Sequence, residues 1–228
     1  MHTVLITGAK RGLGLEFSKQ YADSGWNVIA CCREPSSAPA LQALAQAKSN
    51  VSILALDMAN FDQITQVANS LINTPIDLLI NNAGVYPDSA YGEVDMDDWA
   101  TAFKINSMAP LKMAEAFKAH LAKGQLKKLA TLSSKMGSID DNTSGGSYIY
   151  RSTKTAVNMV MKSLSVDLAP AGISVVTLHP GWVLTDMGGS NALINVNTSV
   201  TGMRKVIDNL RLANTGKFIA YDGKEIPW

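Results

Sequence analysis

The fold is decided by residues 4–14, which read VLITGAKRGLG. Three apolar residues, typical of a buried strand, lead directly into a turn with three glycines and then into a helix-forming sequence. Glycine permits the positive backbone angles of a tight turn and lets the chain approach a phosphate closely. The first turn of the following helix directs unpaired N–H groups at the negative charge. We therefore expect a strand, a phosphate-binding turn and a helix, with an ordinary glycine-rich turn as the alternative.

The rest of the chain alternates short β-rich runs with helical stretches, which predicts a parallel sheet covered by helices on both faces. A length of 228 residues, 46% of them hydrophobic, suits one domain, residues 1–228, with a doubly wound α/β Rossmann fold. The expected strands are His2–Thr7, Asn27–Cys31, Val51–Leu56, Ile76–Asn81, Lys127–Leu132, Ile173–Leu178 and Lys217–Ala220. The expected helices are Gly12–Ser24, Ala38–Lys48, Asn60–Asn73, Met96–Lys123 with a break near Asn106, Gly146–Ala169 and Asn197–Leu212.

The composition argues against several classes of partner. The net charge is +1, so the surface offers no large basic field for nucleic acid or an acidic membrane. No apolar run reaches the roughly 18 residues that a membrane span needs, and the N-terminus has no signal-peptide pattern. We therefore expect a cytoplasmic protein whose partner is a small molecule.

The residue types that bind metals are not arranged as a metal site. Cys31 and Cys32 are adjacent at the end of an expected strand, where a disulfide would be strained, so we expect buried or half-buried free thiols. His2, His120 and His179 are far apart in the sequence, and zinc-ligand spacing is absent. We expect no metal, and a structural or main-chain role for His179.

A tyrosine and a lysine four residues apart, Tyr150 and Lys154, lie on one face of an expected helix. A phenol has a pKa near 10, and a neighbouring ammonium favours the phenolate and lowers that pKa. Tyr150 is therefore the expected general acid, and Lys154 is expected to tune it. The pair alone is a weak signal because the spacing also arises by chance. Tyr148 is no candidate, since Ser152 stands at the equivalent position.

The residues after the second expected strand indicate which dinucleotide fits. NAD sites usually place an acidic residue about 20 positions beyond the glycines, whereas this chain has Arg33 there. A guanidinium binds the 2′-phosphate of NADP with paired hydrogen bonds, and Arg11 in the glycine turn could do the same. We expect NADP(H). Glu34 weakens this argument, and two solvated surface arginines are the alternative.

Further polar stretches stand at expected strand ends or helix breaks. Residues 81–84, Asn-Asn-Ala-Gly, follow the fourth strand, Ser133–Ser138 follow the fifth, and residues 179–187, HPGWVLTDM, follow the sixth. Asn106 lies in an expected helix, close to Pro110. In a doubly wound sheet the ligand lies across the carboxyl ends of the strands, so these stretches should converge on one edge. Taken singly, most of them also fit ordinary turns or helix irregularities.

Together with the Thr-Gly-x-x-x-Gly-x-Gly motif at Thr7–Gly14, these stretches resemble the short-chain dehydrogenase/reductases over essentially the whole chain. Within that family, residues 141–146, 150–154, 179–189 and 221–228 resemble the sniffer-type carbonyl reductases and the C-factor group. The resemblance implies a catalytic set of Asn106, Ser134, Tyr150 and Lys154. The interval between serine and tyrosine is longer here than is usual in relatives, which leaves Ser133 as a minor contender.

The same resemblance implies a role for each residue. Ser134 and Tyr150 would hold a carbonyl oxygen, and Lys154 would also bind ribose hydroxyls. Asn106 would order water between the lysine and solvent. Asp57 would bind the adenine amino group, although alone it also fits a helix-capping aspartate. The implied cofactor contacts are Gly8, Lys10, Arg11, Gly12, Leu13, Gly14, Arg33, Asp57, Met58, Asn82, Ala83, Gly84, Tyr150, Lys154, Pro180, Gly181, Val183 and Thr185.

We expect NADPH-dependent reduction of a carbonyl. Met136, Trp182 and Met187, with Tyr86, would line an apolar and adaptable pocket for an aldehyde, ketone or quinone, although they also fit an ordinary core. Substrate contacts would thus come from these residues together with Ser134 and Tyr150. Two alternatives stay open: a dinucleotide-binding signalling or regulatory protein of the C-factor type, and an NAD-dependent alcohol dehydrogenase.

Two expectations concern mobility and assembly. Residues 188–197, rich in Gly, Ser and Asn, predict a mobile lid. The long helices around Ser107–Lys123 and Gly146–Ala169 are compatible with a homodimer, and equally with burial against the sheet. The apolar residues that permit the dimer are Val157, Met159, Val160 and Met161.

Overall fold

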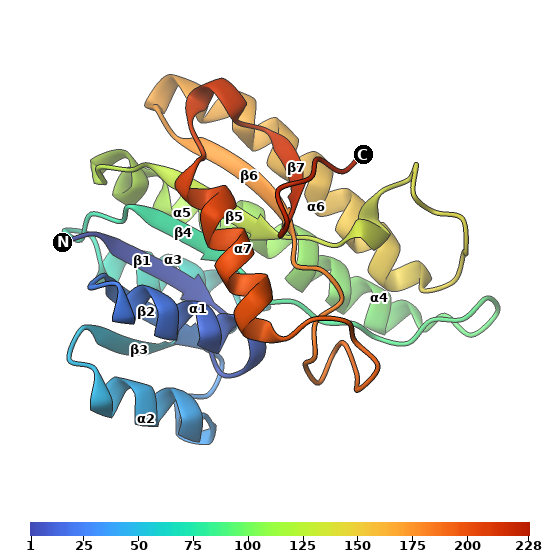
Figure 1. The fold of residues 1–228 in the computed structure, drawn as a ribbon, viewed down its shortest axis with the longest axis horizontal. Helices are drawn as coiled ribbons and strands as arrows, with labels where there is room; N and C mark the ends of the chain where they lie inside the picture. Colours follow the sequence, from blue (N-terminus) through green and yellow to red (C-terminus); the bar gives the residue numbers. More distant parts are fainter.

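In the computed structural model, which describes residues 1–228, seven parallel strands form one sheet in the order β3-β2-β1-β4-β5-β6-β7 (Figure 1). The order reverses at β1, which pairs with β2 on one side and β4 on the other. Because doubly wound sheets bind ligands where the order reverses, the carboxyl ends of β1 and β4 mark the site. The predicted fold class is confirmed. The strands are β1 Thr3–Thr7, β2 Asn27–Cys32, β3 Val51–Ala55, β4 Leu78–Asn81, β5 Lys128–Leu132, β6 Ser174–His179 and β7 Lys217–Ala220.

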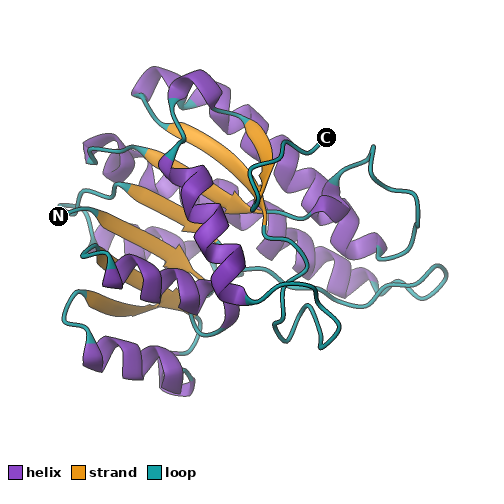
Figure 2. Ribbon diagram, viewed as in Figure 1, coloured by secondary structure: helices purple, strands orange, loops and turns teal.

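Helices cover both faces of the sheet (Figure 2). One face is covered by α1 (Gly12–Asp23), α2 (Pro39–Ala47) and α7 (Val196–Asp208). The other is covered by α3 (Phe61–Ser70), α5 (Ala109–Lys123) and α6 (Tyr148–Asp167), with α4 (Met96–Phe103) leading into α5.

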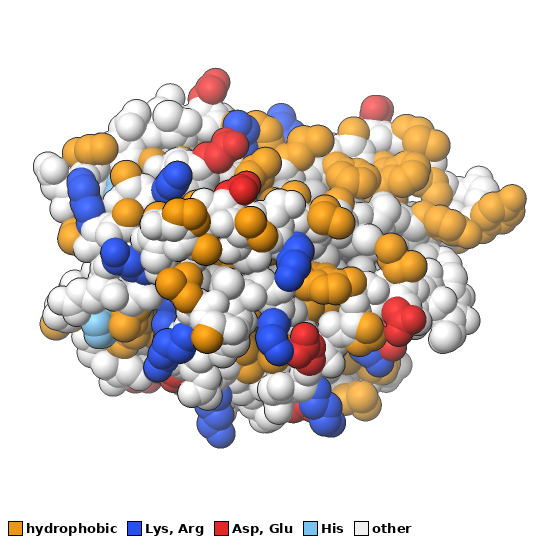
Figure 3. Space-filling view, turned by 90° about the horizontal axis from the view of Figure 1, so that it is seen from above, with side chains coloured by type: hydrophobic (Ala, Val, Ile, Leu, Met, Phe, Trp, Pro, Cys, Tyr) orange, Lys and Arg blue, Asp and Glu red, His pale blue; other side chains and the backbone are white.

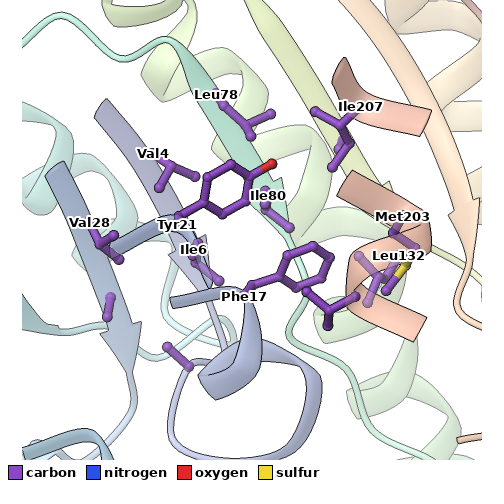
Figure 4. Packing of buried hydrophobic residues seen from close by; sticks show 14 of the residues in the cluster. Val4, Ile6, Phe17, Tyr21, Val28, Leu78, Ile80, Leu132, Met203 and Ile207 are labelled. Atoms are coloured by element: carbon purple, nitrogen blue, oxygen red, sulfur yellow. The ribbon is translucent and has the colours of Figure 1, made fainter. Parts of the chain in front are cut away.

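Each face of the sheet has its own hydrophobic core, because successive residues of a strand point to opposite faces. In β1, Val4 and Ile6 belong to the core beneath α1 and α7, whereas Leu5 belongs to the core beneath α3, α5 and α6. Figure 4 shows Phe17 and Tyr21 of α1 packed among these strand residues and the side chains of α7. The sheet, buried on both faces, is therefore a rigid base for the residues at its carboxyl edge.

Helix α6 begins at Tyr148, two residues later than the sequence predicts. Gly145 and Gly146 both have φ of +64°, and Ser147 has φ of +47°, in the left-handed region that a right-handed helix excludes. The late start places Tyr150 in the first turn of the helix. Other element ends differ from the predicted bounds by up to four residues, as helix and strand ends commonly do.

The predicted helix break near Asn106 is a π-helical turn, Lys104–Met108, between α4 and α5. A π turn inserts an extra residue into the helical ladder and is frequent at functional sites. Asn106 is buried in this turn, so its side chain points inward rather than to solvent.

Strand β7 is one of the two edge strands, and the C-terminal tail covers its free side. The N–H of Ile226 donates to the carbonyl of Phe218, and the N–H of Ala220 donates to that of Lys224. Phe218 also stacks on Trp228. A covered edge offers no template for another strand. None of the helices has the length and apolar character that crossing a bilayer requires.

Candidate active site

The turn between β1 and α1 leaves its backbone open to an anion because its glycines lack side chains. Gly8 and Gly12 have φ of +68° and +55°, which disfavour other residues. A Cβ on Gly14 would lie 2.3 Å from the carbonyl oxygen of Gly8. Helix α1 has no side-chain cap and no acidic residue in its first turn, so its N–H groups are available to an anion. The residues present therefore fit the pyrophosphate of a dinucleotide.

Side chains tie the glycine turn to the end of β4. The Thr7 hydroxyl accepts hydrogen bonds from the N–H groups of Asn82 (3.0 Å) and Ala83 (3.1 Å). The Asn82 amide donates to the carbonyls of Thr7 (2.8 Å) and Gly8 (3.1 Å). Thr7, which sequence reasoning named only as part of the glycine motif, thus positions the turn. The signal available in the sequence was a hydroxyl-bearing residue directly after an apolar strand.

Tyr150, Ser134 and Lys154 meet at the carboxyl end of β5. The Tyr150 phenol is buried, and the Ser134 hydroxyl faces it closely enough to oppose the rise of its pKa. Lys154 Nζ lies 5.6 Å from the centre of the Tyr150 ring and donates to the carbonyl of Leu132 (3.0 Å). The ring of Tyr86 packs against that of Tyr150, with 4.4 Å between centroids. A buried phenol and a buried ammonium therefore stand side by side on α6.

Ser134 rather than Ser133 faces the tyrosine. The Ser133 hydroxyl donates to the carbonyl of Lys154 (3.3 Å), which uses its only proton inside the protein. The Ser134 hydroxyl accepts from the N–H of Met136 (3.1 Å), so its position beside the phenol is fixed. A hydroxyl held there can share a substrate oxygen with Tyr150.

The pKa shifts of the pair are set by burial. Burial raises the pKa of Tyr150 to about 12, with Tyr86 adding to the rise and the Ser134 hydrogen bond opposing it. Burial also lowers the pKa of Lys154 to about 8. The ammonium of Lys154 lies over the Tyr150 ring and donates to the carbonyl of Leu132, and the expectation that it lowers the pKa of Tyr150 stays a prediction. The phenol is consequently a protonated group at neutral pH.

Asn106 fixes the segment after β4 beside the lysine. Its amide donates to the carbonyl of Val85 (2.9 Å) and to the Thr153 hydroxyl (3.0 Å), and its Oδ1 accepts from the N–H of Val85 (2.9 Å). Gly84 lies between Asn106 and Lys154, since a Cβ there would be 3.2 Å from Asn106 Oδ1 and 3.5 Å from Lys154 Nζ. Both amide protons are in use, so one acceptor site on Oδ1 is left for water. Thr153 is a positioning residue that sequence reasoning missed.

The ends of β2 and β3 carry the predicted adenosine-side residues. Lys10 Nζ donates to the Ser37 hydroxyl (3.0 Å), and Arg33 is exposed at the end of β2. The Asp57 carboxylate accepts from the N–H of Ala59 (2.9 Å). The alternative that Asp57 caps the next helix is wrong, because Asn60 caps α3.

The segment after β6 closes against the glycine turn. Gly181 has φ of +84°, and a Cβ there would lie 2.7 Å from a methyl of Ile194. Val183 is buried and forms a bridge with Ile194. Thr185 Cγ2 lies 3.4 Å from the position of a Cβ on Gly12. The segment expected to hold the nicotinamide therefore adjoins the turn expected to hold the pyrophosphate.

Arg11 is paired with a residue far away in the sequence, and its predicted contact with the cofactor stays a prediction. It is exposed, and its guanidinium forms an ion pair of 2.6 Å with Asp186, which follows Thr185. Sequence reasoning gave Asp186 no role, because nothing local connects it to the N-terminal turn. The mobility of residues 188–197 stays a prediction, although Asn195 caps α7 within this range and shortens the loop.

The expectations for the two cysteines and for His179 are confirmed. Cys31 and Cys32 are buried free thiols. His179 Nδ1 accepts the N–H of Lys135 (3.2 Å), and burial lowers its pKa to about 4, which fits the predicted main-chain role. No three His, Cys, Asp or Glu side chains are grouped as a metal centre.

The four residues expected to line an apolar pocket are not core residues. Trp182 and Met187 are about half exposed, Tyr86 is 40% exposed, and Met136 is half-buried. The segments that carry them follow β4, β5 and β6 and extend beyond the carboxyl edge of the sheet (Figure 1). Figure 3 shows hydrophobic side chains gathered at this end, whereas charges of both signs are scattered. The ordinary-core alternative is therefore wrong.

The apolar residues proposed for a dimer are divided between core and surface. Val157 and Met161 are buried against the sheet, and Val160 packs at the margin of the same core. Met159 is exposed on the outer face of α6. Val157 and Met161 therefore cannot form a dimer surface, and the homodimer stays a prediction.

A phosphate-binding glycine turn beside a buried tyrosine and lysine defines a dinucleotide-dependent oxidoreductase site. The sequence model of the family described as "short chain dehydrogenase" matches residues 2–195. The chain belongs to this family, as the resemblance in the motifs predicted.

Relatives and solved structures include a protein named C-signal and two carbonyl reductases. The chain is 46% identical to the C-signal protein of Myxococcus xanthus over 162 residues, covering 71% of this chain and 98% of that protein. It resembles the structure of the carbonyl reductase Sniffer of D. melanogaster with a TM-score of 0.92 at 36% identity, covering 100% of both chains. An NADPH-bound carbonyl reductase from chicken fatty liver matches with a TM-score of 0.95 at 34% identity, covering 100% of this chain and 99% of that one.

Proposed function

We propose that this protein is an NADPH-dependent oxidoreductase that reduces an aldehyde, ketone or quinone to an alcohol. The observation that carries the proposal is the buried Tyr150 phenol, which faces the Ser134 hydroxyl and adjoins Lys154, at the same sheet edge as the glycine turn. The carbonyl reductases among the solved structures, one of them with NADPH, support the cofactor and the reaction class. When bound, the reduced nicotinamide supplies the hydride.

The residues of the chain supply the proton and the positioning. The hydroxyls of Ser134 and Tyr150 bind the carbonyl oxygen. Tyr150, protonated at neutral pH, gives its proton to that oxygen as negative charge develops there. The ammonium of Lys154 favours the phenolate that is left. The free acceptor site of Asn106 orients water beside Lys154, from which the proton of the phenol is restored.

The choice of NADP(H) over NAD(H) rests on cations near the end of β2. Lys10 and Arg33 lie there, and no acidic residue takes the place that a ribose 2′-hydroxyl requires. Exposed cations at this end favour binding of the 2′-phosphate that NADP(H) has and NAD(H) lacks. This argument disfavours the NAD-dependent alcohol dehydrogenase.

The test is a parallel titration with NADPH and NADH, followed by nicotinamide fluorescence, and then turnover on a panel of aldehydes, ketones and quinones. We expect tighter NADPH binding and reduction of at least one carbonyl class. Tyr150→Phe should lower turnover by about 10²- to 10⁴-fold, the usual contribution of a general acid, while NADPH affinity is retained. Binding of NADPH without turnover of any carbonyl would contradict the proposal.

A second candidate is a regulatory protein that binds the dinucleotide with slow turnover. The observation in its favour is the 46% identity with the C-signal protein. In cells that lack the protein, the test compares complementation by the wild type and by Tyr150→Phe. Full complementation by the variant would favour the regulatory role, whereas its loss would favour catalysis.

A further inference from the structure

The loop between Ser134 and Tyr150 is held by the residue that follows the tyrosine. This loop, yellow in Figure 1, leaves the sheet after β5 and returns at the start of α6. Arg151 lies in the first turn of α6, and its guanidinium donates to three acceptors along the loop. They are the carbonyl of Met136 (3.3 Å), the hydroxyl of Ser144 (2.8 Å) and the carbonyl of Gly145 (3.2 Å). These three hydrogen bonds, the Arg151 clamp, tie both ends of the loop to the helix that carries the phenol.

At its first end the clamp acts on Met136, a predicted substrate contact. Met136 is half-buried, and its N–H donates to the Ser134 hydroxyl (3.1 Å). The next residue, Gly137, is anchored independently of the clamp. Its carbonyl accepts from the Thr155 hydroxyl (2.9 Å) and from the Asn158 amide (3.2 Å), both on α6. The Ser134 end of the loop therefore keeps a second anchor when the clamp is removed.

At its second end the clamp leads to Tyr86, the other substrate contact predicted near the phenol. Two residues beyond Gly145, the Ser147 hydroxyl shares a hydrogen bond of 2.7 Å with the Tyr86 hydroxyl. The Tyr86 ring packs on the Tyr150 ring. Ser147 has φ of +47°, which is strained for a residue with a side chain and persists only where surrounding contacts enforce it. Those contacts are the clamp on one side of Ser147 and Tyr86 on the other.

We propose that Arg151 determines which carbonyls reach Tyr150, by holding Met136 directly and Tyr86 through residues 144–147. The inference deepens the proposed function and rests on it. Arg151 is a positioning residue, because it acts through these two neighbours rather than on the reacting atoms. Its hydrogen bonds use the planar fork of a guanidinium, which the ammonium of a lysine cannot reproduce.

The first measurement is amide hydrogen exchange in the free protein, which needs no substrate. Arg151→Met removes the guanidinium, and we expect exchange of residues 136–147 to quicken by about two- to tenfold, the range that one net hydrogen bond corresponds to. Arg151→Lys should have the same effect, because it keeps the charge without the fork. Asp141→Asn is the matched control. It removes the exposed Lys135–Asp141 ion pair of the same loop (2.8 Å) and should leave exchange of residues 144–147 unchanged.

The second measurement is selectivity, taken as the ratio of the highest to the lowest kcat/KM among unbranched aldehydes of increasing length. We expect Arg151→Met and Arg151→Lys to reduce this ratio by about three- to tenfold, through KM. The kcat of the shortest aldehyde and the NADPH affinity should stay within about twofold, as should the ratio in Asp141→Asn. Tyr86→Phe loses the contact with Ser147 and keeps the ring, so it should also reduce the ratio. Added to Arg151→Met, it should reduce the ratio no further.

Several results would overturn the inference. Unchanged exchange in Arg151→Met would show that there is no clamp. Faster exchange with an unchanged ratio, or a wild-type ratio near one, would show that the clamp does not select substrates. An equal fall in kcat for every aldehyde would mean that Arg151 merely supports Ser134, and a wild-type ratio in Arg151→Lys would assign the effect to charge. These results leave the proposed function intact, whereas a wild type that reduces no carbonyl would overturn both.

Discussion

The cofactor side and the substrate side of the site are built in different ways. The glycine turn, Asn82 and the Tyr150–Lys154 pair are held by buried side chains and short hydrogen bonds to the backbone. Farther along the segments that follow β4 and β5, apolar side chains such as Tyr91 and Ile139 are instead exposed. Under the proposed function, we expect the buried side to fix the chemistry and the exposed segments to select the substrate. Substitutions on the two sides should therefore have separable effects.

The largest expected effect is that of Gly14→Ala on the cofactor side. The new methyl would lie 2.3 Å from the Gly8 carbonyl, so the turn must shift. A shift of about 1 Å in a positioning element costs on the order of 100-fold, and we expect NADPH affinity to fall by at least that factor. Fluorescence titration measures it. Gly25→Ala is the control, because its φ of +77° strains the backbone far from the site and should lower stability without changing affinity.

A buried lysine predicts a pH dependence on the same side. Burial lowers the pKa of Lys154 to about 8, so its charge is present below that pH and is lost as pH rises through it. The pH dependence of kcat/KM reports the pKa values of groups in the free protein. We therefore expect kcat/KM for NADPH to fall above about pH 8. Lys154→Met should lower kcat/KM by about 10- to 100-fold at pH 7, the contribution of a charged hydrogen bond, and should abolish the alkaline fall. An unchanged alkaline fall in the variant would assign it to another group.

Substitution of Asn106 tests whether this residue of the π turn contributes only to stability or also to the supply of the proton. Asn106→Ala leaves the N–H and carbonyl of Val85 without their partners, and we expect the free energy of unfolding to fall by about 2 kcal/mol. Turnover should fall severalfold beyond any loss of folded protein. Ser107→Ala is the matched control, since it removes one hydrogen bond from the same turn, to the Thr153 carbonyl. Denaturant unfolding and kcat separate the two roles, and equal losses of kcat in both variants would favour a purely structural Asn106.

The smallest expected effect is on the substrate side. Trp182→Ala removes an indole that is half exposed, and we expect the KM of apolar carbonyls to rise by about two- to tenfold. The kcat of a small aldehyde and the NADPH affinity should stay within about twofold. Trp182→Phe keeps an apolar ring and loses the hydrogen bond to Gly188, so it distinguishes contact with substrate from support of the turn. A change in NADPH affinity as large as that in KM would break the separation between the two sides.

Much of the architecture and of the catalytic set followed from local pattern. Short apolar runs between helical stretches predicted all seven strands. A strand that is buried on both faces requires such a continuous apolar run. The glycine turn was predictable since its backbone angles restrict the residue type. Ser134 and Ser133 differ only in which way each side chain points at the end of β5, and the structure separates them by their hydrogen bonds.

The sequence by itself determined the fold, the glycine turn and the candidacy of Tyr150 and Lys154, because backbone preferences and residue spacing are local properties. Only the tertiary structure decided the pKa of Tyr150, the partner of Arg11 and the burial of Val157. These depend on desolvation and on contacts between residues far apart in the chain. No local pattern specifies such contacts, since they arise when the sheet brings the ends of its strands together.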